Sequence, residues 1–385
     1  MRIAIFHYEI IPTNPTGSCI QKMLRGFCHE HEFTIFAVEF KNPCPDCIQW
    51  VHIPAPTRPL ALLFVIYHLL APLYYCFFIF RNRIRFDQVF LTESTLSFGN
   101  ISYVHFCHRC YLKHFWKYAG IRGIRKGFRW LNHWLHAIVE PLIFRRVKWI
   151  VVPSFGLKRE LEEEYPFIQG KITVIPNPLD IEWIQHRQNF DREKFRHSLG
   201  LTLEDIMLVF IALGNFEHKG LPLILEVLNR LDECRFNLLV VGGKQDLLNY
   251  YRRKVRKMGL DEKVNFIGMQ GDVRPYLWAG DLFVFPSLLE TFSLVCFEAA
   301  GASLPLLVTH LYGIEEFMCD GETGFVVDRT PEGVLEGLVR FLILNPEDRE
   351  AMGKKAQRAV GKYRIERFIE NWTRFFIQTQ KKPYA

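Results

Sequence analysis

Short apolar runs recur along the chain, and segments of helical periodicity separate them. The runs occupy residues 2–7, 33–38, 87–91, 101–105, 149–152 and 172–175 in the first half, and 206–212, 236–241, 264–267, 282–285, 304–308 and 324–327 in the second. Continuously apolar strands that alternate with helices are typical of parallel sheets covered on both faces. The pattern therefore predicts an α/β fold with two Rossmann-like domains.

Two prolines, Pro176 and Pro178, interrupt regular structure between the two series of strands. We expect an N-terminal domain over residues 1–182 and a C-terminal domain over 183–362. Residues 363–385 follow as a separate segment. Its apolar side chains recur at helical spacing, so we expect a final helix that packs back on the first domain; these side chains are Ile365, Phe368, Ile369, Trp372, Phe375 and Phe376.

The longest uncharged stretch runs from Leu60 to Phe80. Its length is sufficient for a transmembrane helix, and arginines flank it. A bilayer would, however, hold the strands before and after it about 30 Å apart, and they could not then join one sheet. We expect a helix that lies beside the sheet or rests on a membrane surface.

The charged residues are distributed unevenly between the two halves of the chain. The chain has 385 residues and a net charge of +7, with 21 basic and 14 acidic residues in 1–185 but 27 of each in 186–385. Nine basic residues and one Glu lie between Lys113 and Lys148, interleaved with Phe and Trp. This mixture favours contact with an anionic membrane over a solvated basic face. Nucleic acid is not expected, because no nucleic-acid-binding motif accompanies the charge.

Ten cysteines are present, and the N-terminus has no secretory signal, so we expect reduced thiols and a cytoplasmic protein. Two C-x-x-C pairs occur, Cys44 with Cys47 and Cys107 with Cys110, and 59 residues separate them. Zinc ribbons separate their pairs by about 15 to 20 residues. We therefore expect no metal; a zinc site formed by the two pairs is the less favoured alternative.

Two small-residue turns follow predicted strands and precede helices. Gly17 lies in the first turn, and Gly214 and Lys219 lie in the second, which ends at Gly220. Such turns present backbone N–H groups to anions, and a lysine adds a mobile cation. The dinucleotide motif G-x-G-x-x-G and the P-loop motif are both absent from the sequence.

The most informative constellation is Glu290 with Glu298. Glu290 follows the strand that ends at Phe285, and Glu298 lies eight residues later in a predicted helix. Eight helical residues rise about 12 Å, so the two carboxylates would contact different parts of a long ligand. Carboxylates accept hydrogen bonds from ribose and sugar hydroxyls. The helix start would offer its N–H groups to a diphosphate; these belong to Phe292, Ser293 and Leu294.

Glu290-x7-Glu298, the Lys219-Gly220 turn and the Pro176-Asn-Pro178 junction together resemble glycosyltransferase family 4. The resemblance implies the GT-B fold, in which two Rossmann-like domains enclose a cleft and a C-terminal helix returns to the first domain. It also implies a retaining enzyme that takes a nucleotide sugar as co-substrate and requires no metal or other cofactor.

The resemblance further implies a role for each matching residue. Glu290 would hold the donor sugar, Glu298 the ribose and Lys219 the pyrophosphate. Gly17 would approach the same phosphates from the first domain, and His105 matches the family histidine beside the transferred sugar.

Some positions depart from the family pattern. Relatives usually carry Arg before the Lys-Gly pair, where this chain has Asn215 and His218, and Phe292-Ser293 replaces Phe-Gly. We expect a UDP- or GDP-sugar donor and a glycan or lipid-linked acceptor, at the inner face of a membrane. The alternative is a non-catalytic sugar- or lipid-binding relative of the same fold.

Overall fold

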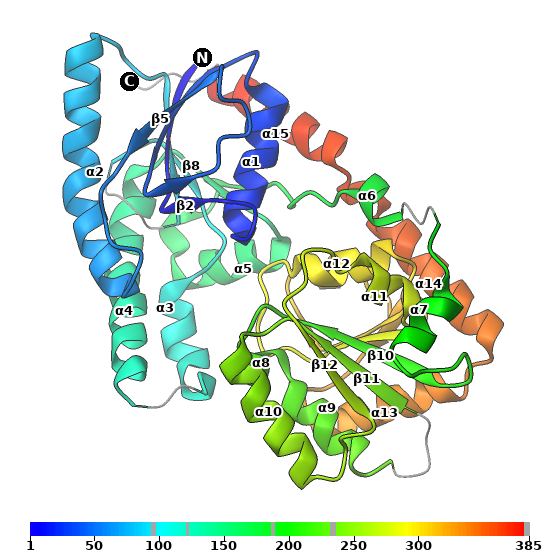
Figure 1. Cartoon of the computed structure of the whole chain (residues 1–385). Helices are drawn as coiled ribbons and strands as arrows, with labels where there is room; N and C mark the ends of the chain where they lie inside the picture. Colours follow the sequence, from blue (N-terminus) through cyan, green and yellow to red (C-terminus); the bar gives the residue numbers. More distant parts are fainter. Residues whose placement is uncertain (94–97, 121–122, 186–188, 232–235, 381–385) are drawn as a thin grey trace. The chain divides into compact units, whose positions relative to one another are not determined.

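The computed structural model describes residues 1–93, 98–120, 123–185, 189–231 and 236–380. The chain forms two compact units (Figure 1): Met1–Pro178 together with Ile365–Ala385, and Leu179–Arg364. Each unit is a parallel sheet flanked by helices, which confirms the predicted α/β class.

In the described part of the first unit, the main sheet has seven parallel strands in the order β5-β3-β1-β6-β7-β8-β9. Six of them match predicted runs. The exception is β5, an edge strand in which only Ile48 is fully buried, so its sequence lacks a continuous apolar run. The strands are β1 (Arg2–Phe6), β3 (Glu32–Ala37), β5 (Ile48–His52), β6 (Gln88–Thr92), β7 (Ile101–Tyr103), β8 (Trp149–Val152) and β9 (Ile172–Val174), and β2 (Glu9–Ile10) pairs separately with β4 (Glu39–Phe40).

Helices cover this sheet (Figure 1). They are α1 (Pro15–Phe27), α2 (Leu60–Asn82), α3 (His108–Cys110), α4 (Ile124–Arg146), α5 (Phe155–Glu164) and α15 (Ile365–Gln380), with short turns η1 (Tyr111–Phe115), η2 (Trp116–Tyr118) and η3 (Pro166–Ile168). The final helix α15 packs on the first unit, as predicted. Trp372 is fully buried there, and its ring centroid lies 5.5 Å from that of Phe90 on β6. Burying this apolar face attaches the chain's last helix to its first domain.

Helix α2 lies between β5 and β6 in the sequence and against the sheet in space. The Tyr67 hydroxyl donates a hydrogen bond of 2.6 Å to the Phe36 carbonyl of β3. Among the described residues, α2 alone is long and apolar enough to cross a membrane, judged by length and composition; 28% of its most apolar window is buried. The strands on either side of it belong to one sheet, as the topological argument requires.

The second unit has a sheet of six parallel strands, counted over its described residues, in the order β12-β11-β10-β13-β14-β15. All six match predicted runs: β10 (Ile206–Ile211), β11 (Phe236–Val241), β12 (Val264–Gly268), β13 (Leu282–Phe285), β14 (Leu306–Val308) and β15 (Gly324–Val326). The helices are α6 (Ile181–Gln185), α7 (Arg192–Ser198), α8 (Phe216–Lys219), α9 (Leu221–Leu228), α10 (Gln245–Lys257), α11 (Arg274–Ala279), α12 (Leu294–Gly301), α13 (Pro331–Leu342) and α14 (Pro346–Val360), with short turns η4 (Ile314–Glu316) and η5 (Gly361–Tyr363).

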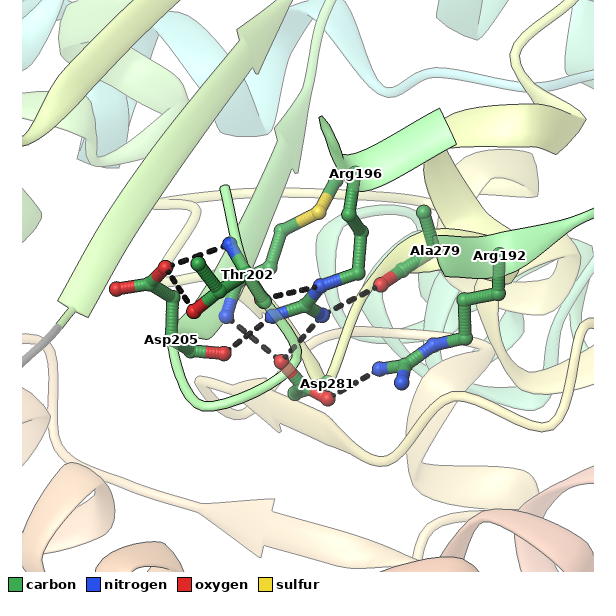
Figure 2. Close-up of polar contacts among 7 residues, drawn as sticks. Arg192, Arg196, Thr202, Asp205, Ala279 and Asp281 are labelled. Atoms are coloured by element: carbon green, nitrogen blue, oxygen red, sulfur yellow. Dashed lines mark hydrogen bonds and ion pairs between the residues drawn. The ribbon is translucent and has the colours of Figure 1, made fainter. Parts of the chain in front are cut away.

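A fully buried arginine fixes the start of this sheet (Figure 2). Arg196 of α7 donates from Nη1 to Asp281 Oδ2 at 2.9 Å and to the Ala279 carbonyl at 3.0 Å, and from Nε to the Thr202 carbonyl at 3.0 Å. Asp281 Oδ2 also accepts the backbone N–H of Met207 at 2.7 Å. Because Asp281 directly precedes β13 and Met207 lies in β10, the arginine and the carboxylate join two central strands to α7.

Candidate functional site

Two loops of the second unit leave neighbouring strands at their carboxyl ends. One continues from β10 through residues 212–220, and the other continues from β13 through residues 286–293. Since β10 and β13 pair in parallel, both loops emerge at the same edge of the sheet. Ligands of open parallel α/β sheets bind at this edge.

Lys219 and Glu290 meet between these loops. The Lys219 ammonium donates a hydrogen bond to Glu290 Oε1, and the Ser287 hydroxyl donates to the same oxygen at 2.9 Å. The two charged side chains are 27% and 12% exposed, so solvent screens the pair only partly. The structure therefore brings together two of the predicted site residues, and Ser287 is a third member that the sequence analysis missed.

Glu298 lies in the same neighbourhood, on α12. Burial raises the pKa of the Cys296 thiol, and the negative charges of Glu290 and Glu298 raise it further. The Ser293 hydroxyl and the positive charge of Lys219 partly offset this rise. Glu298 follows Cys296 by two residues on α12, the helix that begins directly after the Glu290 loop. The predicted acid pair and the predicted lysine therefore belong to the same loop and helix region of the second unit.

Phe292, Ser293 and Leu294, at the start of α12, differ from one another in burial and backbone conformation. Phe292 is buried and stacks on Phe297 with ring centroids 4.1 Å apart. Ser293 has a left-handed backbone (φ +43°) and gives the helix no side-chain cap, and Leu294 is the first helical residue. A helix start without a side-chain cap has N–H groups to offer to another acceptor. The diphosphate contact expected of these residues remains a prediction.

Gly220 is required by the close packing of its turn. Its backbone has φ +87°, and a Cβ there would lie 2.2 Å from the Pro286 carbonyl oxygen. Only glycine lets the Lys219 turn approach the end of β13 this closely. Gly214, by contrast, has no atom within 4 Å of the position that a Cβ would take. Its predicted approach to a ligand stays a prediction.

Gly17 lies in the first turn of α1, where a Cβ would come within 2.7 Å of the Glu9 carbonyl oxygen. Its N–H donates a hydrogen bond of 2.9 Å to Asn14 Oδ1, which caps the helix. The packing of α1 on β2 thus accounts for a glycine here. The N–H already has an acceptor, so this geometry adds no support for the expected phosphate contact, which remains a prediction.

His105 lies just beyond β7 in the first unit and is buried. Its Nε2 is 3.1 Å from Asn177 Oδ1, which also accepts the Tyr103 hydroxyl at 3.1 Å. Because an amide oxygen only accepts, Nε2 carries the proton and Nδ1 offers a lone pair. That Nδ1 has no hydrogen-bond partner among the described residues, and Glu93 Oε1 lies 3.9 Å from it.

The neighbouring strands add two more polar groups. His7 follows β1, and its Nδ1 donates to Thr92 Oγ1, whose hydroxyl donates in turn to the Phe6 carbonyl. The His7 Nε2 lone pair and the Tyr8 hydroxyl are buried and have no hydrogen-bond partner in the described part of the chain. We call His7, Tyr8, Glu93 and His105 the strand-end cluster. Since β1, β6 and β7 are adjacent and parallel, all four residues follow carboxyl ends at one sheet edge.

The strand-end cluster is uncharged at neutral pH. Burial lowers the pKa of His7 to about 3 and that of His105 to about 4, and burial raises the pKa of Glu93 to about 8. Burial likewise raises the pKa of Tyr8. The cluster therefore presents neutral acceptors and donors, which suit hydroxyl groups better than anions. Sequence reasoning identified His105 and missed the others, although His7 and Tyr8 end or directly follow an apolar run and Glu93 comes two residues after one.

The two C-x-x-C pairs lie in different hydrophobic clusters. Cys107 and Cys110 are buried beside α4, and Cys44 and Cys47 pack near Cys28 of α1. The four thiols therefore do not form one zinc site. Over the described residues, no group of three or more His, Cys, Asp or Glu side chains has a geometry that could hold a metal ion.

Comparisons with known proteins agree with this architecture. The family described as Glycosyl transferases group 1 matches residues 191–359, and the Glycosyltransferase Family 4 description matches residues 17–183. The lipopolysaccharide 1,2-N-acetylglucosaminetransferase of Salmonella typhimurium is 28% identical over 280 residues, which cover 66% of this chain and 70% of that protein. The chain spans about half or less of the length of several other curated glycosyltransferases that it matches.

Two solved structures share the fold. WaaG, a glycosyltransferase involved in lipopolysaccharide biosynthesis, has a TM-score of 0.76 at 17% identity over 97% of this chain and 99% of its own. Anabaena HepE in complex with UDP and glucose has a TM-score of 0.72 at 15% identity over 98% of this chain and 100% of its own. The two family matches together span most of the sequence, and the relatives and structural neighbours agree with them: the chain is a glycosyltransferase of the predicted GT-B fold, whose first part matches Glycosyltransferase Family 4 and whose second part matches Glycosyl transferases group 1.

Proposed function

We propose that the chain transfers a sugar from a UDP- or GDP-sugar to a glycan or lipid-linked acceptor and retains the anomeric configuration. The observation that carries this proposal is the Lys219–Glu290 pair at the strand-end edge of the second unit. A cation beside a carboxylate offers one group for a phosphate and one for sugar hydroxyls, as a nucleotide sugar requires. HepE, which shares the fold, was solved with UDP and glucose, and this supports the donor class.

Each residue has a distinct role in this proposal. Lys219 offsets the charge that develops on the leaving diphosphate, which is the form of electrostatic stabilisation that contributes most in such reactions. Glu290 accepts hydrogen bonds from the donor sugar, and Glu298 accepts them from the ribose. Ser287 holds the Glu290 carboxylate in place through its 2.9 Å hydrogen bond. In retaining transfer at one face of the sugar, the leaving phosphate takes the acceptor's proton, so no side-chain nucleophile is needed.

The strand-end cluster supplies the second part of the proposal. His105 Nδ1 and His7 Nε2 are lone pairs without a hydrogen-bond partner among the described residues, and a buried acceptor of this kind calls for a donor. Sugar hydroxyls are such donors, and they carry no charge that the buried cluster would have to accommodate. We assign the hydroxyl groups of a neutral sugar to this cluster.

The surface of the first unit supports the proposed acceptor class. Helix α2 exposes a stripe of apolar side chains at helical spacing, which contains Leu69 (63% exposed), Leu73 (64%), Phe77 (61%) and Phe80 (84%). Helix α4, which lies beside α2 (Figure 1), exposes Trp130 and Trp134, whose rings stack 6.0 Å apart. Exposed apolar stripes of this extent are typical of membrane-binding surfaces. They support a membrane-associated enzyme with a lipid-linked acceptor.

Basic groups adjoin the stripe. A hollow of about 690 Å³ lies at the C-terminal end of α2 and is lined by Cys76, Ile79, Phe80, Arg81, Arg83, Ile84 and Arg85. Three arginines beside an exposed phenylalanine suit the phosphate of an anionic lipid headgroup above its acyl chain. Relatives named for lipopolysaccharide synthesis, such as the Salmonella enzyme, support an envelope glycan as the acceptor.

A nucleotide-release assay tests the enzymatic proposal. The protein is incubated with a panel of UDP- and GDP-sugars and with lipid-linked glycan, and free UDP or GDP is measured. We expect release from one donor that depends on Lys219 and Glu290. A non-catalytic relative would be stabilised against thermal unfolding by a sugar or lipid, without any nucleotide effect and without release.

A further inference from the structure

Three thiols and an imidazole gather at the C-terminal end of α1 in the first unit. Cys28 Sγ lies 2.9 Å from Cys44 Sγ, and Cys47 Sγ lies 3.7 Å from His29 Nδ1. Cys44 and Cys47 both pack against the hydrophobic cluster that contains Cys28. We call Cys28, Cys44 and Cys47 the thiol cluster.

The fold holds these thiols against one another. Cys28 is the C-terminal cap of α1, and the other two lie in the loop between β4 and β5. Asn42 braces that loop, because its Oδ1 accepts the Cys44 N–H at 2.9 Å and its Nδ2 donates to the Ile48 carbonyl at 3.0 Å. The Cys47 N–H donates a hydrogen bond of 3.1 Å to the Cys44 carbonyl, which forms a turn. The contact between the sulfurs is therefore a consequence of an ordered loop.

The thiol cluster is more accessible to solvent than the other C-x-x-C pair. Cys44 and Cys47 are half-buried, whereas Cys107 and Cys110 are both buried. A reagent in solution can reach the half-buried Cys44, whose thiol contacts the buried Cys28 thiol. A disulfide has a sulfur–sulfur distance of about 2.05 Å, so Cys28 and Cys44 need to approach by less than about 1 Å to form one.

We propose that Cys28 and Cys44 form a reversible disulfide when a low-molecular-weight disulfide such as oxidised glutathione is present. The Cys44 thiolate attacks one glutathione sulfur, which forms a mixed disulfide and releases one glutathione thiolate. The Cys28 thiolate then attacks the Cys44 sulfur and releases the second glutathione. Two protein thiols lose two electrons and two protons, and one glutathione disulfide becomes two glutathione molecules.

The contact between the two sulfurs favours the second step, because the Cys28 thiol already lies 2.9 Å from Cys44 Sγ. Burial and the neighbouring Cys44 raise the pKa of Cys28. A thiolate is the reacting form in exchange with disulfides, so we expect closure to become faster as the pH rises.

The disulfide would raise the thermal stability of the protein. It would join the end of α1 to the loop that precedes the edge strand β5, across a sequence separation of 16 residues. Closing a loop of this size restricts the unfolded chain. We expect the oxidised protein to unfold about 5 to 10 °C above the reduced protein, measured without reductant.

Peptide mapping tests the assignment. The full-length protein is treated with reduced or oxidised glutathione, free thiols are alkylated, and tryptic peptides are analysed without reduction. Cleavage after Arg25 and Lys41 places Cys28 in one peptide and Cys44 with Cys47 in the next. We expect a cross-link between these peptides that dithiothreitol removes. Cys44→Ser should abolish most of it, and Cys47→Ser and the control Cys319→Ser should retain it.

Two results would overturn the proposal. One is the formation of glutathione adducts alone, with no cross-link between the two peptides in the wild-type protein. The other is stoichiometric zinc in the purified protein that leaves only when these thiols are alkylated, because the cluster would then be a metal site. The mapping does not involve sugar transfer, so neither result bears on the proposed enzymatic function.

Discussion

Lys219 and Glu290 are 71 positions apart in the sequence, and the ammonium of one donates a hydrogen bond to the carboxylate of the other. Their loops follow adjacent parallel strands, so the sheet topology brings them together. Ser287 holds the same carboxylate oxygen. In the proposed function, Lys219 would engage the diphosphate of the donor and Glu290 its sugar.

Replacing either member of this pair should reduce transfer. We expect Lys219→Met and Glu290→Gln each to lower kcat/KM by about 10²- to 10³-fold, because each removes a group assigned to the donor. Donor turnover at several concentrations measures the effect. Lys257→Met, which changes an exposed lysine on α10, serves as the matched control and should have wild-type activity. Wild-type turnover by Lys219→Met would contradict the assignment.

Glu93 should make the first unit less stable as the pH rises. Its carboxyl has a folded pKa of about 8 against 4.5 when free. The folded protein therefore keeps a proton that the unfolded chain loses, and the stability that this provides is full below pH 4.5 and is lost as the pH rises through 8. We expect Glu93→Gln to reduce the fall in unfolding free energy between pH 6 and 9 by about 1 to 3 kcal/mol.

Urea titrations of wild type and Glu93→Gln at both pH values measure this difference. Glu140, Tyr8 and His105 face the same region, and burial raises the pKa of Glu140 to about 7, which gives a pH dependence of the same sign. Glu140 is present in both proteins, so the difference between them reports on Glu93 together with its coupling to Glu140. Parallel pH curves for the two proteins would show that Glu93 is ionised in the fold at neutral pH.

Arg196→Met should strongly destabilise the second unit. The substitution removes a fully buried guanidinium, so the Thr202 and Ala279 carbonyls lose that donor, while Asp281 keeps its ion pair with Arg192. Leaving a buried polar group without its hydrogen-bond partner costs about 1 to 3 kcal/mol for each group. Denaturant unfolding measures the loss, and Arg253→Met, at an exposed position on α10, should change stability by less than about 0.5 kcal/mol. A loss of under 1 kcal/mol would refute a structural role for the arginine.

Two sets of substitutions separate the apolar and electrostatic parts of membrane binding. Replacing Arg81, Arg83 and Arg85 with Ala should weaken binding to anionic vesicles at low salt by about fivefold for each charge removed. Replacing Leu73, Phe77 and Phe80 with Ser should weaken binding to neutral and anionic vesicles alike, because these side chains are exposed. Vesicle sedimentation measures both. Unchanged sedimentation of both variants would exclude this face of α2 as the membrane contact.

The periodicity of the sequence determined most of the architecture. Central strands such as β1 and β10 are buried on both faces, so their sequences are continuously apolar and can be recognised. The edge strand β5 escaped recognition because four of its five residues are not fully buried, and its pattern resembles that of a loop. The apolar face of α15 likewise predicted that this helix packs on another element.

The candidate residues Lys219 and Glu290 could be proposed from the sequence because they lie in recognisable turns after strands. The strand-end cluster could not, since the importance of His7, Tyr8 and Glu93 comes from burial and from unmatched hydrogen-bonding groups. The sequence by itself determined which elements form and which polar residues follow them. The tertiary structure alone decided which of those residues are buried together, because hydrogen-bond partners and desolvation depend on strands that are distant in the sequence.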